Sequence, residues 1–193
     1  LHSFPTRRSS DLIKLLFEMT DLLPFYERRE ACDINVVSAK LYSIMQKEWE
    51  ASLATKPKLR TYIKFKRVFE VEKYMKVYLT RTQRSLLAQF RLGILPLHVE
   101  TGRFRGVPLN NRVCNMCTDL FIEDEFHFLC ICDFYDDLRQ NMYRKVCEAY
   151  PLFLHQSNEE KFIYLISEES KLVAKYLCDA WCRRREHLYR GIP

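Results

Sequence analysis

The chain has few residues that interrupt helices, with only four glycines and seven prolines among its 193 residues. Glycine and proline mark turns, so their scarcity favours helical segments. No run of eighteen apolar residues occurs, which excludes a transmembrane helix. A phosphate-cradling glycine loop and a Gly-x-Ser-x-Gly sequence are also missing, and five histidines are too few for a hydrolase relay. We therefore predict a mostly α, helical domain without catalytic residues.

A secretory signal peptide is missing as well. Eight cysteines would suit a secreted disulfide scaffold, but without a signal peptide a reducing intracellular compartment, cytoplasm or nucleus, fits them better. Thiols that stay reduced there are available to a metal ion. Apolar residues make up 48% and aromatic residues 13% of the chain, which argues against disorder. The length suffices for one domain with a hydrophobic core.

The segment CNMCTDLFIEDEFHFLCIC contains four metal-ligand residue types at metal-like spacing. Two residues separate Cys114 from Cys117. Nine residues separate Cys117 from His127, and four separate His127 from Cys132. Three thiolates and one imidazole satisfy a tetrahedral divalent ion, and zinc is its natural occupant. With all four positions filled by protein, the zinc would be structural. We expect a small zinc-knuckle hairpin, with Cys130 as the alternative to Cys132.

A second cysteine pair lies near the C-terminus. Cys178 and Cys182 are four residues apart and, with His187, form a second possible ligand set. Cysteine is often simply a small buried hydrophobic residue. We therefore favour core packing for this pair.

The same segments resemble a known family. CNMC followed by DEFHFLCICDFYDDLR is similar to the zinc-binding region that follows the polymerase domain in reverse transcriptases of non-LTR retrotransposons. The stretch Arg84 to Cys114 resembles the segment leading into that site, and Lys56 to Lys66 resembles a weaker flank. The resemblance extends from about residue 35 and is strongest over 84–139. It implies a zinc site formed by Cys114, Cys117, His127 and Cys132, and upstream reverse transcriptase domains in the same polypeptide.

The first twelve residues require separate treatment. LHSFPTRRSSDL is the translation of a common sequencing-adapter oligonucleotide, residue for residue. We treat residues 1–12 as an artefactual leader rather than as a basic targeting peptide. We therefore expect the chain to be a C-terminal fragment of a longer protein.

Positive charge is concentrated in the middle of the chain. Residues 40–112 carry 16 Lys/Arg and 5 Asp/Glu, a net charge of +11, whereas residues 113–193 carry a net charge of −4. Such a basic segment suits a phosphate backbone, and interleaved aromatic side chains suit stacking on single-stranded bases. The predicted nucleic-acid contacts are Lys58, Arg60, Lys64, Lys66, Arg67, Arg81, Arg84, Arg91, Arg103, Arg105 and Arg112. The alternatives are a solvated basic surface and pairing of the last three arginines with Glu123, Asp124 and Glu125.

Apolar spacing predicts the helices. An amphipathic helix is expected over 36–53, capped by Asp33 or Asn35, followed by an extended stretch over 56–65 and a helix over 68–79. Thr80 and Gln83 form a predicted capping box for a helix that ends at Gly93, with Arg81, Arg84 and Arg91 on its exposed face. The expected remainder is a loop over 96–111, a short helix at the second ligand pair, and helices from Asp133 to about Tyr150, from Ser157, and from Ser167 to Tyr189.

The sequence Phe134-Tyr135-Asp136-Asp137 matches the aspartate pair of a reverse transcriptase palm. In polymerases this signature lies between strands, where it binds two magnesium ions. Here it lies just after a candidate zinc ligand, at the start of an amphipathic helix, where carboxylates favour the positive end of the helix dipole. We therefore predict no polymerase activity for this chain.

These expectations combine into one interpretation. The leader (1–12) and an irregular tail (13–34) precede a basic helical segment (35–111), a zinc knuckle with its following helix (112–150) and C-terminal helices (151–193), with 35–193 as one compact unit. The expected function is zinc-stabilised binding of template RNA or target DNA, with no membrane partner. The alternative is a free-standing zinc-stabilised protein-interaction module.

Overall fold

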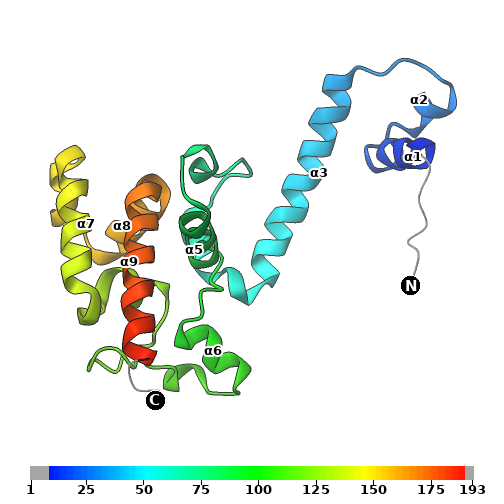
Figure 1. Cartoon of the computed structure of the whole chain (residues 1–193). Coiled ribbons are helices and arrows are strands. Elements are labelled where there is room, and N and C mark those ends of the chain that lie inside the picture. The colour runs from blue at the N-terminus through cyan, green and yellow to red at the C-terminus, as the bar shows by residue number, and fades with distance from the viewer. Residues whose placement is uncertain (1–8, 190–193) are drawn as a thin grey trace. The chain divides into compact units, whose positions relative to one another are not determined.

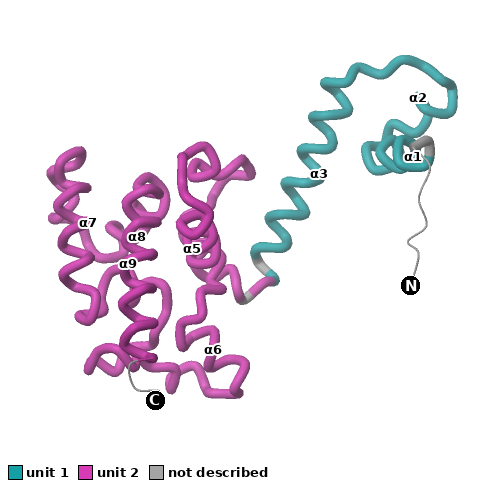
Figure 2. The backbone as a smooth tube through the Cα atoms, viewed as in Figure 1, with its two compact units in different colours: residues 1–55 teal, residues 56–193 magenta. Residues whose placement is uncertain are grey.

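The computed structural model describes residues 9–189, and helices dominate this part of the chain (Figure 1). The mostly α prediction is therefore confirmed. Two compact units result, Leu1–Thr55 and Lys56–Pro193 (Figure 2). The boundary falls after Thr55, so the helix expected at 36–53 belongs to the first unit rather than to one unit spanning 35–193. Most of the adapter-like leader lies outside the described residues.

Over residues 9–55, the first unit contains three helices: α1 (Ser9–Met19), α2 (Leu23–Glu27) and α3 (Ile34–Thr55). The second contains α4 (Tyr62–Phe65), α5 (Arg81–Arg91), α6 (His98–Phe104), α7 (Asp136–Ala149), α8 (Asn158–Glu168) and α9 (Ser170–Tyr189). Short 3₁₀ turns are η1 (Pro57–Arg60), η2 (Lys73–Lys76), η3 (Leu109–Asn111), η5 (Asp133–Tyr135) and η6 (Pro151–His155), and η4 (His127–Ile131) is a π turn.

In the first unit, the turn between α1 and α2 is tied to α3. The ammonium of Lys40 donates a hydrogen bond to the carbonyl oxygen of Thr20 at 2.9 Å, and the rings of Phe17 and Tyr26 lie 5.7 Å apart. Asp33 accepts a hydrogen bond from the backbone N–H of Asn35 at 2.9 Å, so Asp33 rather than Asn35 caps the start of α3.

The core of the second unit is built around α9, which packs against α5, α7 and α8 (Figure 1). The buried face of α9 repeats at three- and four-residue steps through Val173, Leu177 and Ala180. Phe90 of α5 and Phe162 of α8 meet in this core with their ring centroids 6.4 Å apart. Burial of this continuous apolar cluster is the main source of stability for the unit.

Local capping signals set two of the helix starts. The Thr80 hydroxyl accepts from the backbone N–H of Gln83, and the Gln83 side chain accepts from the N–H of Thr80, which confirms the predicted capping box of α5. Ser157 and Glu160 form the same arrangement at α8. Gly93, with φ +67°, ends the turn after α5, as expected.

Two predictions for residues 56–79 were wrong. The stretch 56–65 is not extended but forms η1 and α4, because Pro57 suits the first position of a helical turn. The helix expected over 68–79 is reduced to η2. Val68 and Val71 remain 56% and 69% exposed, so no continuous apolar face exists there to bury.

Three further boundaries differ from expectation. The predicted loop over 96–111 contains α6 and η3. The helix expected from Asp133 begins at Asp136 after the 3₁₀ turn η5, without a side-chain cap. The last helix begins at Ser170 rather than at Ser167.

Candidate metal centre

The first half of the candidate metal centre is a short loop that doubles back on itself. Val113 and Ile122 form a single antiparallel bridge, and the N–H of Cys114 donates to the carbonyl oxygen of Phe121 at 2.9 Å. Residues 113–122 form what we call the knuckle loop, which carries both cysteines of the CNMC segment. The backbone N–H of Met116 lies 3.4 Å from Sγ of Cys114, so a backbone amide points at this sulfur.

The second half is a helical segment capped by Asp124. Its carboxylate accepts a hydrogen bond from the N–H of His127 at 2.8 Å. The segment continues as the π turn η4, in which the N–H of Cys132 donates to the carbonyl oxygen of His127 at 2.8 Å. Residues five apart in an α-helix point about 140° apart. The wider π turn reduces this angle, which allows His127 and Cys132 to face the same point.

The two halves bring four side chains together. The ligand atoms of Cys114, Cys117, His127 and Cys132 all lie within 4.8 Å of one another. Sγ of Cys114 lies 3.9 Å from Sγ of Cys132, and Sγ of Cys117 lies 3.4 Å from Nε2 of His127. A tetrahedral zinc ion holds two sulfurs about 3.8 Å apart, and sulfur and nitrogen about 3.5 Å apart. The side chains therefore fit a zinc ion.

The cysteines differ in their readiness to ionise. The pKa of Cys114 is lowered to about 3, chiefly because the Cys132 thiol donates a hydrogen bond to its sulfur. The pKa of Cys132 is raised by the same hydrogen bond, and burial raises the pKa of Cys117. The protein itself thus stabilises one thiolate within the cluster. A divalent cation would supply the charge that the other two thiolates need.

The position of Cys130 decides between the two candidates for the fourth ligand. Cys132 belongs to the cluster, whereas Cys130 lies outside it. Cys130 is buried near Tyr143, and burial raises the pKa of its thiol to about 12. Cys178 and Cys182 do not gather with His187, and residues 9–189 contain no second cluster of this kind.

A buried carboxylate lies directly behind the cluster. Glu123 is 1% exposed, and its Oε1 lies 3.5 Å from Sγ of Cys114. The guanidinium of Arg184 in α9 donates to both oxygens of Glu123, and the N–H of His98 at the start of α6 donates to Oε2 at 2.7 Å. Burial raises the pKa of Glu123, against the lowering effect of Arg184. One carboxylate therefore connects the knuckle loop, α6 and α9.

A second buried carboxylate connects the helical half to η1 and α4. Glu125 accepts hydrogen bonds from Arg60 at 2.8 Å and from the Thr61 hydroxyl at 2.9 Å. Burial raises the pKa of this carboxyl group, and the nearby Arg60 opposes the rise. The segment with the candidate ligands His127 and Cys132 is thus braced by residues from the N-terminal end of the unit.

The predicted basic residues fall into different environments. Several hold the fold together: Arg60 pairs with Glu125, Lys66 with Glu72, Arg103 and Lys58 with Glu100, and Arg112 donates to the carbonyl oxygens of Val99 and Val107. The ammonium of Lys64 lies over the Phe126 and Phe162 rings. Others form no salt bridge within the described part of the chain: Arg67, Arg81, Arg84 and Arg105. The alternative considered for Arg103, Arg105 and Arg112, pairing with Glu123, Asp124 and Glu125, is not observed among the described residues.

Arg91 is not on the exposed face of α5, contrary to prediction. It is 5% exposed, donates to Glu72 and to the carbonyl oxygen of Ile166, and stacks 4.1 Å from the centroid of the Phe65 ring. Neutralisation by Glu72 is what makes this burial possible. Arg91 is therefore not available as a surface contact.

The two aspartates of the palm-like sequence lie in the first turn of α7. Asp136 accepts a hydrogen bond from Arg139 at 2.7 Å, and Asp137 pairs with Arg183 of α9. Hydrogen bonds from Arg183 lower the pKa of Asp137 to about 2. Both carboxylates thus lie at a helix N-terminus, as the sequence suggested, and the structure shows in addition that each is paired with an arginine.

Comparisons of the chain with protein-family models, with curated proteins and with solved structures found no match. Among the described residues, no helix combines the length and the apolar character that crossing a membrane requires.

Proposed function

We propose that the chain is a zinc-stabilised, non-catalytic domain that binds template RNA or target DNA, from the C-terminal region of a retrotransposon-type reverse transcriptase. The observation that carries this proposal is the gathering of Cys114, Cys117, His127 and Cys132 within 4.8 Å. Zinc in such a site has no position left for water and therefore stabilises the fold rather than reacting. The proposal places the protein inside the cell, where its thiols remain reduced.

Charge supports nucleic acid as the partner. Arg67, Arg81 and Arg105 are exposed and form no salt bridge with any described residue. Cations that are not neutralised by the protein are the ones that can replace counterions on a phosphate backbone.

The test is binding of labelled oligonucleotides to the zinc-loaded full chain at increasing salt. Each phosphate contact should lower the logarithm of the affinity by about 0.7–0.9 for each tenfold rise in salt concentration. Cys114→Ser should release zinc and lose this binding. An affinity that does not depend on salt, or no binding at about 0.15 M salt, would contradict the proposal.

The alternative, a protein-interaction module, also has an observation in its favour. Leu120 and Phe121 in the knuckle loop are 80% and 57% exposed. Apolar side chains presented on a rigid loop suit a protein partner. The salt series distinguishes the two functions, since a protein partner does not require affinity for oligonucleotides.

A further inference from the structure

Two hollows adjoin along α9. One, of about 620 Å³, lies between α5 and α9 and is lined by residues that include Arg81, Trp181 and Arg185. The other, of about 430 Å³, extends toward α6 and the knuckle loop, and includes Arg105 and Tyr189 with the same Trp181 and Arg185. Because two side chains line both hollows, we treat them as one surface and call it the α9 groove, defined by these five residues.

The α9 groove has an excess of positive charge. Arg81, Arg105 and Arg185 are exposed and form no salt bridge with any residue in the range 9–189. The carboxylates that line the hollows are already neutralised, since Asp179 pairs with Lys175 at 3.0 Å and Glu123 pairs with Arg184. Three guanidinium groups therefore lack a partner within the described protein. Guanidinium forks match the geometry of phosphate oxygens.

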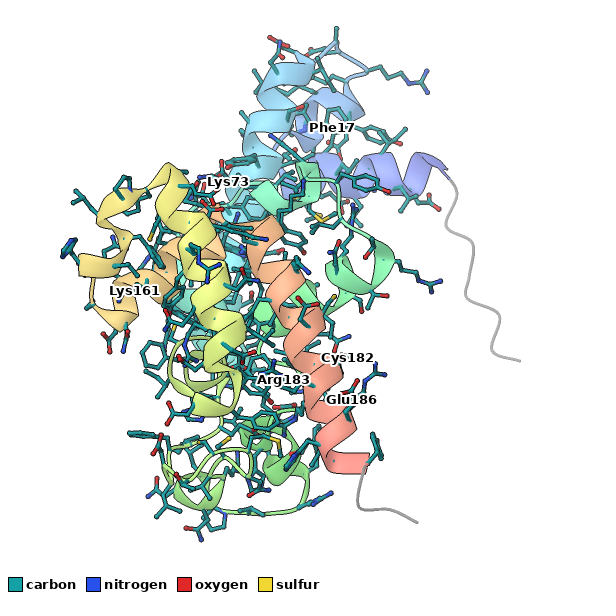
Figure 3. All side chains as sticks on the ribbon, turned by 60° about the vertical axis from the view of Figure 1, so that its left-hand side comes forward. Phe17, Lys73, Lys161, Cys182, Arg183 and Glu186 are labelled. Carbon is teal, nitrogen blue, oxygen red and sulfur yellow. The ribbon has the colours of Figure 1, made fainter. Side chains whose placement is uncertain are left out.

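The groove also presents aromatic surface. Trp181 lies at the junction of the two hollows, and Tyr189 at the end of α9 is 65% exposed. Arg183 projects toward α7, where it pairs with Asp137, whereas Cys182 lies on the opposite side of the α9 ribbon and lines the groove (Figure 3). Trp181 is half-buried, with the Arg184 guanidinium 5.8 Å from the centroid of its ring, so Tyr189 is the more accessible of the two aromatic side chains. Aromatic side chains beside unpaired arginines suit a single strand, because its bases are unstacked and available. A duplex hides these base faces.

We propose that the α9 groove binds a single-stranded nucleic acid. Arg81, Arg105 and Arg185 contact phosphates, and Trp181 and Tyr189 stack against bases. This inference rests on the proposed function and makes it more specific. The proposed contact surface is a face formed by three helices. It is not the stretch 56–67, where most cations are engaged within the fold.

The first experiment measures the binding of a labelled single strand of about twelve nucleotides, a length within typical site sizes, to the zinc-loaded full chain. An RNA strand, a DNA strand and the DNA duplex are compared by fluorescence anisotropy. The double variant Arg81→Ala/Arg185→Ala should bind roughly tenfold more weakly at about 0.15 M salt, and its salt slope should be shallower by about 1.4. The matched control is Arg144→Ala/Lys171→Ala, which removes the same charge from exposed positions outside the groove.

A second experiment tests stacking. The chain has two tryptophans, so Trp49→Phe leaves Trp181 as the reporter. The single strand should quench this fluorescence, whereas the control oligonucleotide duplex should not. Tyr189→Ala should weaken binding at least about fivefold, and Tyr189→Phe should restore it, because stacking needs the ring and not the hydroxyl.

The outcomes separate the two proposals. If neither RNA nor DNA binds the wild-type chain in a salt-dependent way, both proposals fail. If a strand binds but the groove variant and its control weaken binding equally, the α9 groove is wrong and the proposed function stands. Equal affinity for the duplex would overturn the single-strand assignment. Preference for RNA or for DNA then identifies the strand that the groove takes.

Discussion

Arg184 of α9 and Glu123 behind the knuckle form an ion pair in which both carboxylate oxygens accept hydrogen bonds, and the two side chains are only 9% and 1% exposed. The same carboxylate accepts a hydrogen bond from the backbone N–H of His98, and its Oε1 lies 3.5 Å from Sγ of Cys114. The last helix of the domain is therefore fastened directly to the candidate metal centre. Removing one partner would leave an uncompensated buried charge.

Arg184→Met should destabilise the second unit by about 3–5 kcal/mol, because Glu123 loses its counter-charge. The measurement is urea unfolding of the zinc-loaded chain, followed by Trp181 fluorescence in a Trp49→Phe background. Arg183→Met is the matched control, since its partner Asp137 is 67% exposed and such pairs contribute about 0.2–1 kcal/mol. Equal costs for the two variants would show that the buried pair has no special role.

Variants of the two neighbouring cysteines, Cys130 and Cys132, should differ in their zinc content. Cys132→Ser removes a ligand from the cluster and should abolish stoichiometric zinc, because three ligands leave an open site. Cys130→Ser makes the same chemical change outside the cluster and should retain one zinc ion per chain. Metal analysis after dialysis checks both variants. Zinc loss from the Cys130 variant alone would assign the fourth ligand the other way.

The thiol of Cys130 should also resist alkylation. Its pKa of about 12 leaves almost no thiolate at neutral pH, whereas Cys182 is exposed. Mass spectrometry of the zinc-loaded chain after iodoacetamide treatment at about pH 8, half a unit below the free thiol pKa, should find Cys182 modified and Cys130 intact.

The raised pKa of the Cys130 thiol also sets the sign of the pH dependence of the free energy of unfolding. An unfolded chain releases the Cys130 proton near pH 8.5, whereas the folded chain holds it until about pH 12. The stabilisation from this group is therefore complete below about pH 8.5 and is lost as the pH rises toward about 12. The alkaline loss of stability should be shallower in Cys130→Ala than in the wild type.

The features that the sequence could predict are those encoded by near neighbours. The capping box predicted at Thr80 and the helix start predicted at Ser157 each depend on a partner three residues away. The candidate ligand set also follows from spacing, because Cys114 and Cys117 share one short loop and His127 and Cys132 share one helical turn. Residue type and spacing along the chain were sufficient to predict these features.

The features that could not be predicted depend on distant partners. The cap of α6 is a carboxylate 25 residues further along the chain, since His98 donates to Glu123, so the segment alone reads as a loop. Arg91 looks like a surface cation until Glu72 and the carbonyl of Ile166, 75 residues away, are in place. Arg185 carries no local signal at all, because the groove exists only once α5, α6 and α9 have packed.

Gly93 supplies the last prediction, because two independent constraints meet at this residue. Its φ of +67° lies in the left-handed region, and a Cβ there would approach the carbonyl oxygen of Lys58 to 2.5 Å. Gly106 has nearly the same φ, +69°, but nothing lies within 4 Å of its Cβ position.

Gly106→Ala should therefore cost only the left-handed strain, about 1–2 kcal/mol. Gly93→Ala must also displace backbone at η1, next to the Arg60–Glu125 pair that braces the segment with the candidate metal ligands. Its melting temperature should fall well below that of the Gly106 variant, and zinc should be released more readily. Similar melting temperatures for both variants would mean that η1 moves aside without cost.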